Sequence, residues 1–111
     1  PIKLENKLCN EFLKGCMYME EISSTKLFKV IGKNIKYYRK LYNLKIGKMT
    51  QEDLAEIVDV STALIGGLES DKINQGVSVF NLWKISNALQ ISIDKLFDNS
   101  ESSNRFIENT K

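Results

Sequence analysis

The chain has 111 residues, 42% of them hydrophobic, so it can form one small helical domain, and one proline with six glycines leaves little room for many-turned sheets. No apolar run approaches the length of a membrane span and no signal-peptide pattern heads the sequence, so we expect a cytoplasmic protein with no membrane partner. The net charge is +2. The absence of histidine, the presence of only two cysteines and the lack of a phosphate loop or nucleophile motif argue against an enzyme, a metal site or a cofactor.

Residues 1–25 form an N-terminal extension. Leu4, Leu8 and Phe12 recur every four residues, which predicts a short amphipathic helix. Lysine and glutamate are mixed on its polar side. We therefore expect the apolar stripe to pack on this domain, or on a second copy of it, rather than on a membrane.

A long helix is expected to begin after the cap candidates Ser23, Ser24 and Thr25 and to run to about Tyr42. The following link, residues 43–49, either extends this helix or forms a basic loop. Apolar residues at helical spacing define the side of the helix that should face the core. They are Leu27, Ile31, Ile35, Tyr38 and Tyr42.

Positive charge is concentrated in one segment of the chain. Between Lys26 and Lys48 there are eight basic residues and no acidic one, whereas from Met49 onward ten acidic residues face five basic ones. An electropositive helix and loop are what attraction to phosphates requires, although a charge run alone also fits a solvated helix face. The candidates for phosphate contacts in this segment are Lys33, Lys36, Lys40 and Lys48.

Residues 51–70 have the pattern of a helix-turn-helix, in which two short apolar-periodic segments are joined by a tight turn. Thr50 can cap the first helix, and Asp53 can bond back to it to complete a capping box. Asp59 falls where the chain must leave this helix, often with a positive φ. The residues expected to share the inward face of the first helix are Leu54, Ile57 and Val58.

The second helix of this unit should be capped by Ser61 and anchored to the core by Ile65 and Leu68. The exposed face of such a helix lies against DNA. Here that face has no amide or guanidinium group able to distinguish one base pair from another. Its expected members are Thr62, Ala63, Leu64, Gly66 and Gly67. The two glycines either allow close approach to DNA or mark a face no longer selected for reading bases.

The remainder of the chain should be helical up to a polar tail. After a polar loop, Ser78 caps a helix in which Trp83 is expected to belong to the core. Ser92 caps a final turn over residues 93–97. Residues 99–111 contain few apolar residues and are expected to form a mobile tail.

Several short segments occur in a familiar order: Ile31 to Ile35, Arg39-Lys40, Thr50-Gln51, Leu54-Ala55, Val60-Ser61, Ile65, Leu68-Glu69 and Ala88-Leu89. In this order they resemble the phage-repressor and Cro-like regulators, the XRE type, over about residues 26–97. The resemblance implies that Thr50 and Gln51 reach the DNA backbone or a base at the edge of the site. The helix cap alone also explains Thr50, and the two roles can coexist. It further implies an internal ion pair between Arg39 and Glu69.

These observations predict an all-α, five-helix repressor-like domain over residues 26–98, between the extension 1–25 and the tail 99–111. Its expected function is to bind duplex DNA as a homodimer and to regulate transcription, as a repressor, by binding rather than catalysis. The alternative is a protein-interaction module, such as an antagonist, co-regulator or antitoxin-like partner. The candidate DNA contacts besides the four lysines are Thr50, Gln51, Ser61, Thr62, Ala63, Gly66, Gly67, Lys72, Asn74 and Gln75.

Overall fold

A computed structural model describes residues 23–99, and these residues are helical with no strands. Their elements are α2 (Ser24–Lys45), α3 (Gln51–Val58), α4 (Thr62–Glu69), α5 (Val79–Ala88) and the 3-10 helix η1 (Ile93–Phe97). The predicted all-α class is therefore confirmed. The predictions of an amphipathic stripe near the N-terminus and of a mobile tail lie outside the described residues, apart from Asn99. Within the described range, no helix is both long and apolar enough to cross a membrane.

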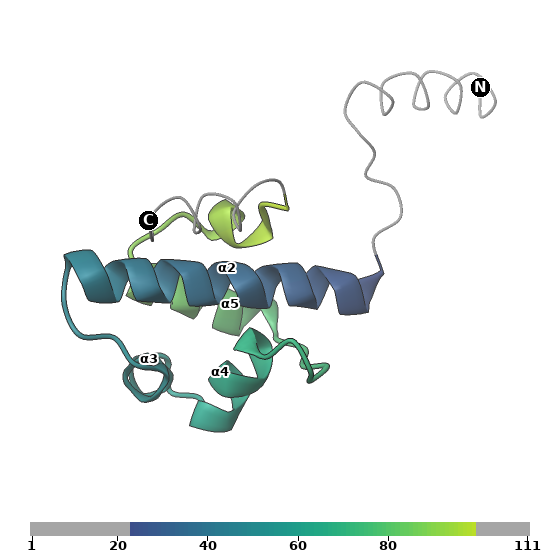
Figure 1. The fold of residues 1–111 in the computed structure, drawn as a ribbon, viewed down its shortest axis with the longest axis horizontal. Helices are drawn as coiled ribbons and strands as arrows, with labels where there is room; N and C mark the ends of the chain where they lie inside the picture. The colour runs from purple at the N-terminus through teal and green to yellow at the C-terminus, as the bar shows by residue number, and fades with distance from the viewer. Residues whose placement is uncertain (1–22, 100–111) are drawn as a thin grey trace, which may run out of the picture.

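Helix α2 is the long element against which the others are arranged (Figure 1). In the view of Figure 1, α3 and α4 lie below α2, η1 lies on its opposite side, and α5 lies behind it. Helix α2 contacts both α4 and η1, and α5 contacts both α3 and η1. The core lies where these elements meet, and all five contribute side chains to it.

The start and the end of α2 follow from local hydrogen bonds. The Ser23 hydroxyl accepts a hydrogen bond from the backbone N–H of Lys26 at 3.2 Å, which is the predicted type of cap. At the other end, the N–H groups of Ile46 and Gly47 both donate to the carbonyl of Tyr42, at 2.8 and 3.1 Å. The helix is therefore three residues longer than predicted. The first residues of the link extend α2 to Lys45, and the rest form a short turn. The link therefore combines the two predicted alternatives, a longer helix and a loop.

The core consists of one apolar cluster contributed by every described helix and by the link before α3. Most inward positions predicted from helical spacing are confirmed, with Leu27, Tyr38 and Tyr42 packed at its edge. Burial of these side chains is the main stabilising contribution to so small a domain. The buried members are Ile31, Ile35, Met49, Leu54, Ala55, Val58, Ile65, Leu68, Leu82, Ile85, Leu89 and Leu96.

Two large residues predicted to face the core are exposed, and these predictions are wrong. Ile57 is 59% exposed, because α3 is rotated so that the small Ala55 is buried and the helix can approach α4 closely. Trp83 is 53% exposed, because the small Ser86 occupies the inward position on α5 and donates its hydroxyl hydrogen to the Trp83 carbonyl at 2.8 Å. Leu64, predicted to be exposed, is half-buried and packs against the core cluster.

Two polar or small residues of α2 fix the neighbouring elements. A β-carbon at Gly32 would overlap the Leu68 carbonyl oxygen, so α2 and α4 touch backbone to backbone at this point. The fully buried Asn34 donates from its amide nitrogen to the carbonyls of Leu96 and Asp98, at 2.8 and 2.9 Å, which ties η1 to α2. The Gly32 contact thus determines where α4 lies relative to α2, and the Asn34 hydrogen bonds determine where η1 lies.

Candidate nucleic-acid interface

The first helix of the predicted helix-turn-helix begins with a complete capping box. The Thr50 hydroxyl accepts from the Asp53 N–H at 3.0 Å, and the Asp53 carboxylate accepts from the Thr50 N–H at 2.9 Å. The backbone hydrogen bond from Thr50 is the largest reason why the pKa of Asp53 lies below its usual value. The Thr50 hydroxyl and the charge of Lys48 lower this pKa further. The predicted capping box is confirmed.

The turn between α3 and α4 has the predicted left-handed residue. Asp59 has φ 65° and ψ 50°, and its N–H donates to the carbonyls of Ala55 and Glu56. The following residue, Val60, packs against the core, and the Ser61 hydroxyl accepts from the Leu64 N–H at 3.0 Å. Aspartate is among the residues that adopt this conformation at low cost. The sequence therefore orients α4 with its N-terminal turn exposed.

A buried ion pair joins three helices behind this unit. Arg39 of α2 donates two hydrogen bonds to the Glu69 carboxylate of α4, Nε to Oε2 at 2.8 Å and Nη2 to Oε1 at 2.9 Å. The Glu69 side chain is only 2% exposed. The amide nitrogen of Gln51 also donates to Glu69 Oε1, at 2.9 Å, and Arg39 donates to the Met49 carbonyl at 3.1 Å. The predicted pairing of Arg39 with Glu69 is confirmed, and it also holds Gln51 in place.

The glycines of α4 do not both face outward. Gly66 is half-exposed, but Gly67 is buried, so its predicted place on the outward face is wrong. The physical reason is Gln75 of the loop after α4, because a β-carbon at Gly67 would lie 3.0 Å from the Gln75 amide oxygen. A β-carbon at Gly66 would lie 3.5 Å from the Gln51 amide oxygen. A glutamine from another element therefore lies beside each glycine.

An open groove runs along the ends of three helices. It has a volume of about 330 Å³ and lies where α2 ends and where α3 and α4 begin. Thr50, Gln51 and Thr62 from the candidate set border it, and the first-turn N–H groups of a helix have no partner within that helix. The complete lining is Arg39, Asn43, Met49, Thr50, Gln51, Glu52 and Thr62. Ser61 and Ala63 are exposed beside this groove.

The candidate lysines lie on two strips of the α2 surface. Lys36 follows Gly32 by four residues and precedes Arg39 by three, and both of those residues contact α4, so Lys36 lies on the flank nearest α4. Lys33 directly follows Gly32 in the sequence, and Lys40 directly follows Arg39; both lysines are exposed. Because successive residues of an α-helix are turned by about 100°, these two lysines point farther from α4 than Lys36 does. Lys48 is exposed in the link before α3.

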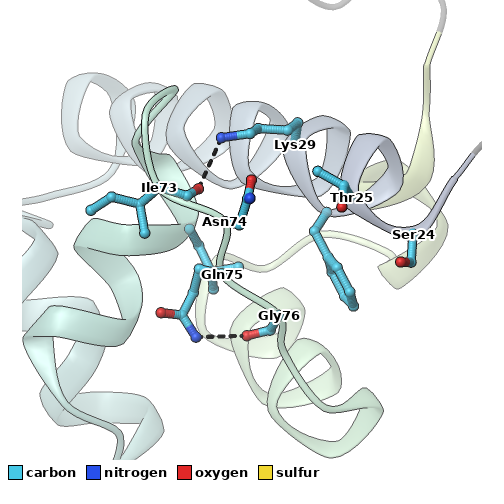
Figure 2. A pocket seen from close by; sticks show the side chains of 9 residues that line it. Ser24, Thr25, Lys29, Ile73, Asn74, Gln75 and Gly76 are labelled. Atoms are coloured by element: carbon cyan, nitrogen blue, oxygen red, sulfur yellow. Dashed lines mark hydrogen bonds between the residues drawn. The ribbon is translucent and has the colours of Figure 1, made fainter.

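A lysine outside the candidate set has a role that the sequence did not reveal. Lys29 donates to the carbonyls of Asp71 and Ile73, at 2.7 and 2.9 Å, and so fixes the loop between α4 and α5 to α2. Figure 2 shows the bond to Ile73. A cavity of about 180 Å³ lies between this loop and the first turns of α2. The loop carries the candidates Lys72 and Asn74, which are exposed, and Gln75, which is half-buried. Only the net positive charge of the segment, and not this contact, was visible in the sequence.

Comparison with known proteins gives one match. A family model described as helix-turn-helix matches residues 35–96, which extend from the middle of α2 to η1 and include the whole α3–turn–α4 unit. No curated protein and no solved structure shows significant similarity to the chain. The matched segment covers more than half of the sequence and lies within the described residues. The chain belongs to the helix-turn-helix family of DNA-binding regulators, of the XRE type.

Proposed function

We propose that this helix-turn-helix regulator binds a specific duplex DNA sequence as a homodimer and represses transcription in the cytoplasm. The observation that carries the proposal is the exposed N-terminal turn of α4, with Ser61, Thr62 and Ala63, beside the open groove at the start of α3. A surface helix of this kind fits the major groove, which admits one α-helix. A bound dimer would repress by blocking access of the transcription machinery to the same DNA.

Affinity would come chiefly from the phosphates. The groove between α2, α3 and α4 is bordered by the N-terminal end of α3, and Lys48 is exposed in the link just before that helix. Helix N-termini bind anions through their free N–H groups and the helix dipole. Lys36, Lys33 and Lys40 would extend the positive surface along α2, and Lys72 and Asn74 would reach phosphates on the other side of α4.

Sequence preference would come from few direct contacts. Thr62 can exchange one hydrogen bond with a base and touch a thymine methyl group, and Ala63 offers a methyl contact only. Gln51, held by Glu69, borders the same surface. With so few groups on α4 itself, the shape and deformability of the DNA would contribute to the preference.

A selection of random duplexes by the purified full chain, at a low and at a moderate salt concentration, tests the proposal. The expected result is enrichment of one motif with two-fold symmetry, weaker at the higher salt. Enrichment of unrelated sequences would contradict specific recognition. No retention of any duplex at low salt would contradict DNA binding altogether.

A second function, binding of a protein antagonist or co-regulator, is favoured by one observation. Helix α5 exposes Val79, Phe80 and Trp83, and the last two rings are stacked with centroids 6.3 Å apart. Exposed aromatic groups of this kind are typical of protein interfaces. A chain that retains no duplex but binds another DNA-binding regulator, and loses that binding on Trp83→Ser, would support this second function instead.

A further inference from the structure

The outer face of α4 lacks an amide or guanidinium group of its own. By helical geometry Thr62, Ala63 and Gly66 lie at its centre, and Gly67 lies on one flank. None of these residues has a side chain that can read a base pair by two hydrogen bonds. A group that supplements the weak contacts of Thr62 and Ala63 would therefore have to come from outside the helix.

Gln75 lies across the flank of α4 at Gly67. A β-carbon at Gly67 would be 3.4 Å from both Cβ and Cγ of Gln75 and 3.0 Å from its Oε1. The whole Gln75 side chain therefore rests on the glycine, and a larger residue at 67 would displace it. Figure 2 shows this side chain extending away from Lys29, with its amide nitrogen toward the Gly76 carbonyl.

The orientation of the Gln75 amide follows from its partner. The backbone carbonyl of Gly76 can only accept, and it receives a hydrogen bond from Gln75 Nε2 at 3.0 Å. Gln75 Oε1 is therefore the atom that lies over α4. The same logic holds for Gln51, because the Glu69 carboxylate accepts from its Nε2 at 2.9 Å and leaves Oε1 beside Gly66. One side-chain carbonyl oxygen thus lies beside Gly66 and another beside Gly67.

The loop that carries Gln75 is fixed by hydrogen bonds along its length as well as by its connections to α4 and α5. Lys29 bonds the carbonyls of Asp71 and Ile73, and the Lys72 N–H donates to the Ser70 hydroxyl at 3.1 Å. A side chain positioned by such supporting contacts can discriminate between ligands, because little ordering is required when the complex forms.

We propose that Gln75 is a specificity-determining residue, whose side-chain oxygen accepts a hydrogen bond from the exocyclic amino group of an adenine or a cytosine in the major groove. In that groove only adenine N6 and cytosine N4 present donors, whereas guanine and thymine present acceptors. Gly67 is then the space in α4 that admits Gln75. This inference rests on the proposed DNA binding and names the group that reads one position of each half-site.

The test compares selected motifs for the parent chain and four variants, with a thermal melt of each to verify folding. Gln75→Ala should reduce the preference for an amino-bearing base at one half-site position by about fivefold to tenfold, leaving the other positions and the salt dependence unchanged. Gln75→Lys replaces an acceptor by donors and should shift that position toward guanine. Gly67→Ala should weaken the same position by displacing Gln75.

Asn74→Ala is the matched control, since it removes a neighbouring loop amide that is exposed. It should lower affinity for all sequences equally and leave the motif unchanged. If the parent chain selects a motif and Gln75→Ala selects the same one, or loses affinity uniformly, the inference about Gln75 is overturned while DNA binding stands. If the parent chain retains no duplex, the proposed function and this inference are overturned together.

Discussion

Gly32 of α2 lies directly against the carbonyl oxygen of Leu68 in α4, so these two helices meet without a side chain between them. This crossing places the basic surface of α2 next to the helix that would enter the DNA groove. Since neither backbone can move without shifting a helix, the contact is less adaptable than an ordinary side-chain contact in the core.

Gly32→Ala should therefore destabilise the fold severely, by about 3 kcal/mol or more. Gly47→Ala is the matched control, because a β-carbon there would meet nothing within 4 Å. Urea denaturation of both variants measures the difference. Equal free energies of unfolding for the two variants would show that α2 and α4 do not cross as closely as described.

The Arg39 and Glu69 pair should behave as one unit in a double-mutant cycle. Arg39→Met or Glu69→Gln alone should each lower the free energy of unfolding by about 3 kcal/mol, because one desolvated group loses its partner. The double variant should be less destabilised than the sum of the two, measured by chemical denaturation at neutral pH. Additive losses would mean that the two side chains do not interact.

The capping box at Thr50 and Asp53 predicts a pH dependence with a definite sign. The folded-state pKa of Asp53 is lowered, mainly by the hydrogen bond from the Thr50 backbone, so its contribution is present above the unfolded pKa of about 3.9. This contribution is lost as the pH falls through the folded pKa. The stability difference between the parent chain and Asp53→Asn should be constant above about pH 5 and should shrink below about pH 4. A difference that persists unchanged at pH 2.5 would contradict this assignment.

Phe97 is 41% exposed at the end of η1, and we propose that it lies at the contact between the two copies of the homodimer. Phe97→Ser should raise the dimer dissociation constant at least about tenfold, or 1.4 kcal/mol, in sedimentation equilibrium. Trp83→Ser, on the other exposed apolar surface, is the comparison. A loss of dimer only in Trp83→Ser would place this contact on α5, and no change in either variant would exclude both surfaces.

Local signals in the sequence predicted much of this structure. The caps at Thr50, Ser61 and Ser78, the left-handed Asp59 and the two helices between them depend on residues within four positions of each other. Such patterns are read directly from the chain. The pairing of Arg39 with Glu69 spans 30 residues and was predictable only from resemblance to the family.

The features that were missed depend on how helices are placed and rotated in three dimensions. Gly32, Asn34 and Lys29 make their contacts 36 to 64 residues away in sequence, and nothing near them in the chain identifies the partner. The exposure of Ile57 and Trp83 depends on how α3 and α5 are rotated about their axes, with Ala55 and Ser86 on the buried faces. Apolar spacing defines a broad stripe and leaves such rotations open.

The salt dependence of DNA binding tests the central claim most directly. The selected duplex should be titrated with the parent chain, with the double variant Lys36→Glu plus Lys40→Glu, and with Lys95→Glu, an exposed lysine of η1, as control. The parent chain should show a steep linear fall of log affinity with log salt. The double variant should bind all duplexes more weakly, with a slope smaller by about 0.9 for each lost phosphate contact, and the control should match the parent. A flat salt dependence in the parent chain, or an unchanged slope in the double variant, would contradict the account of α2 as the phosphate-binding surface.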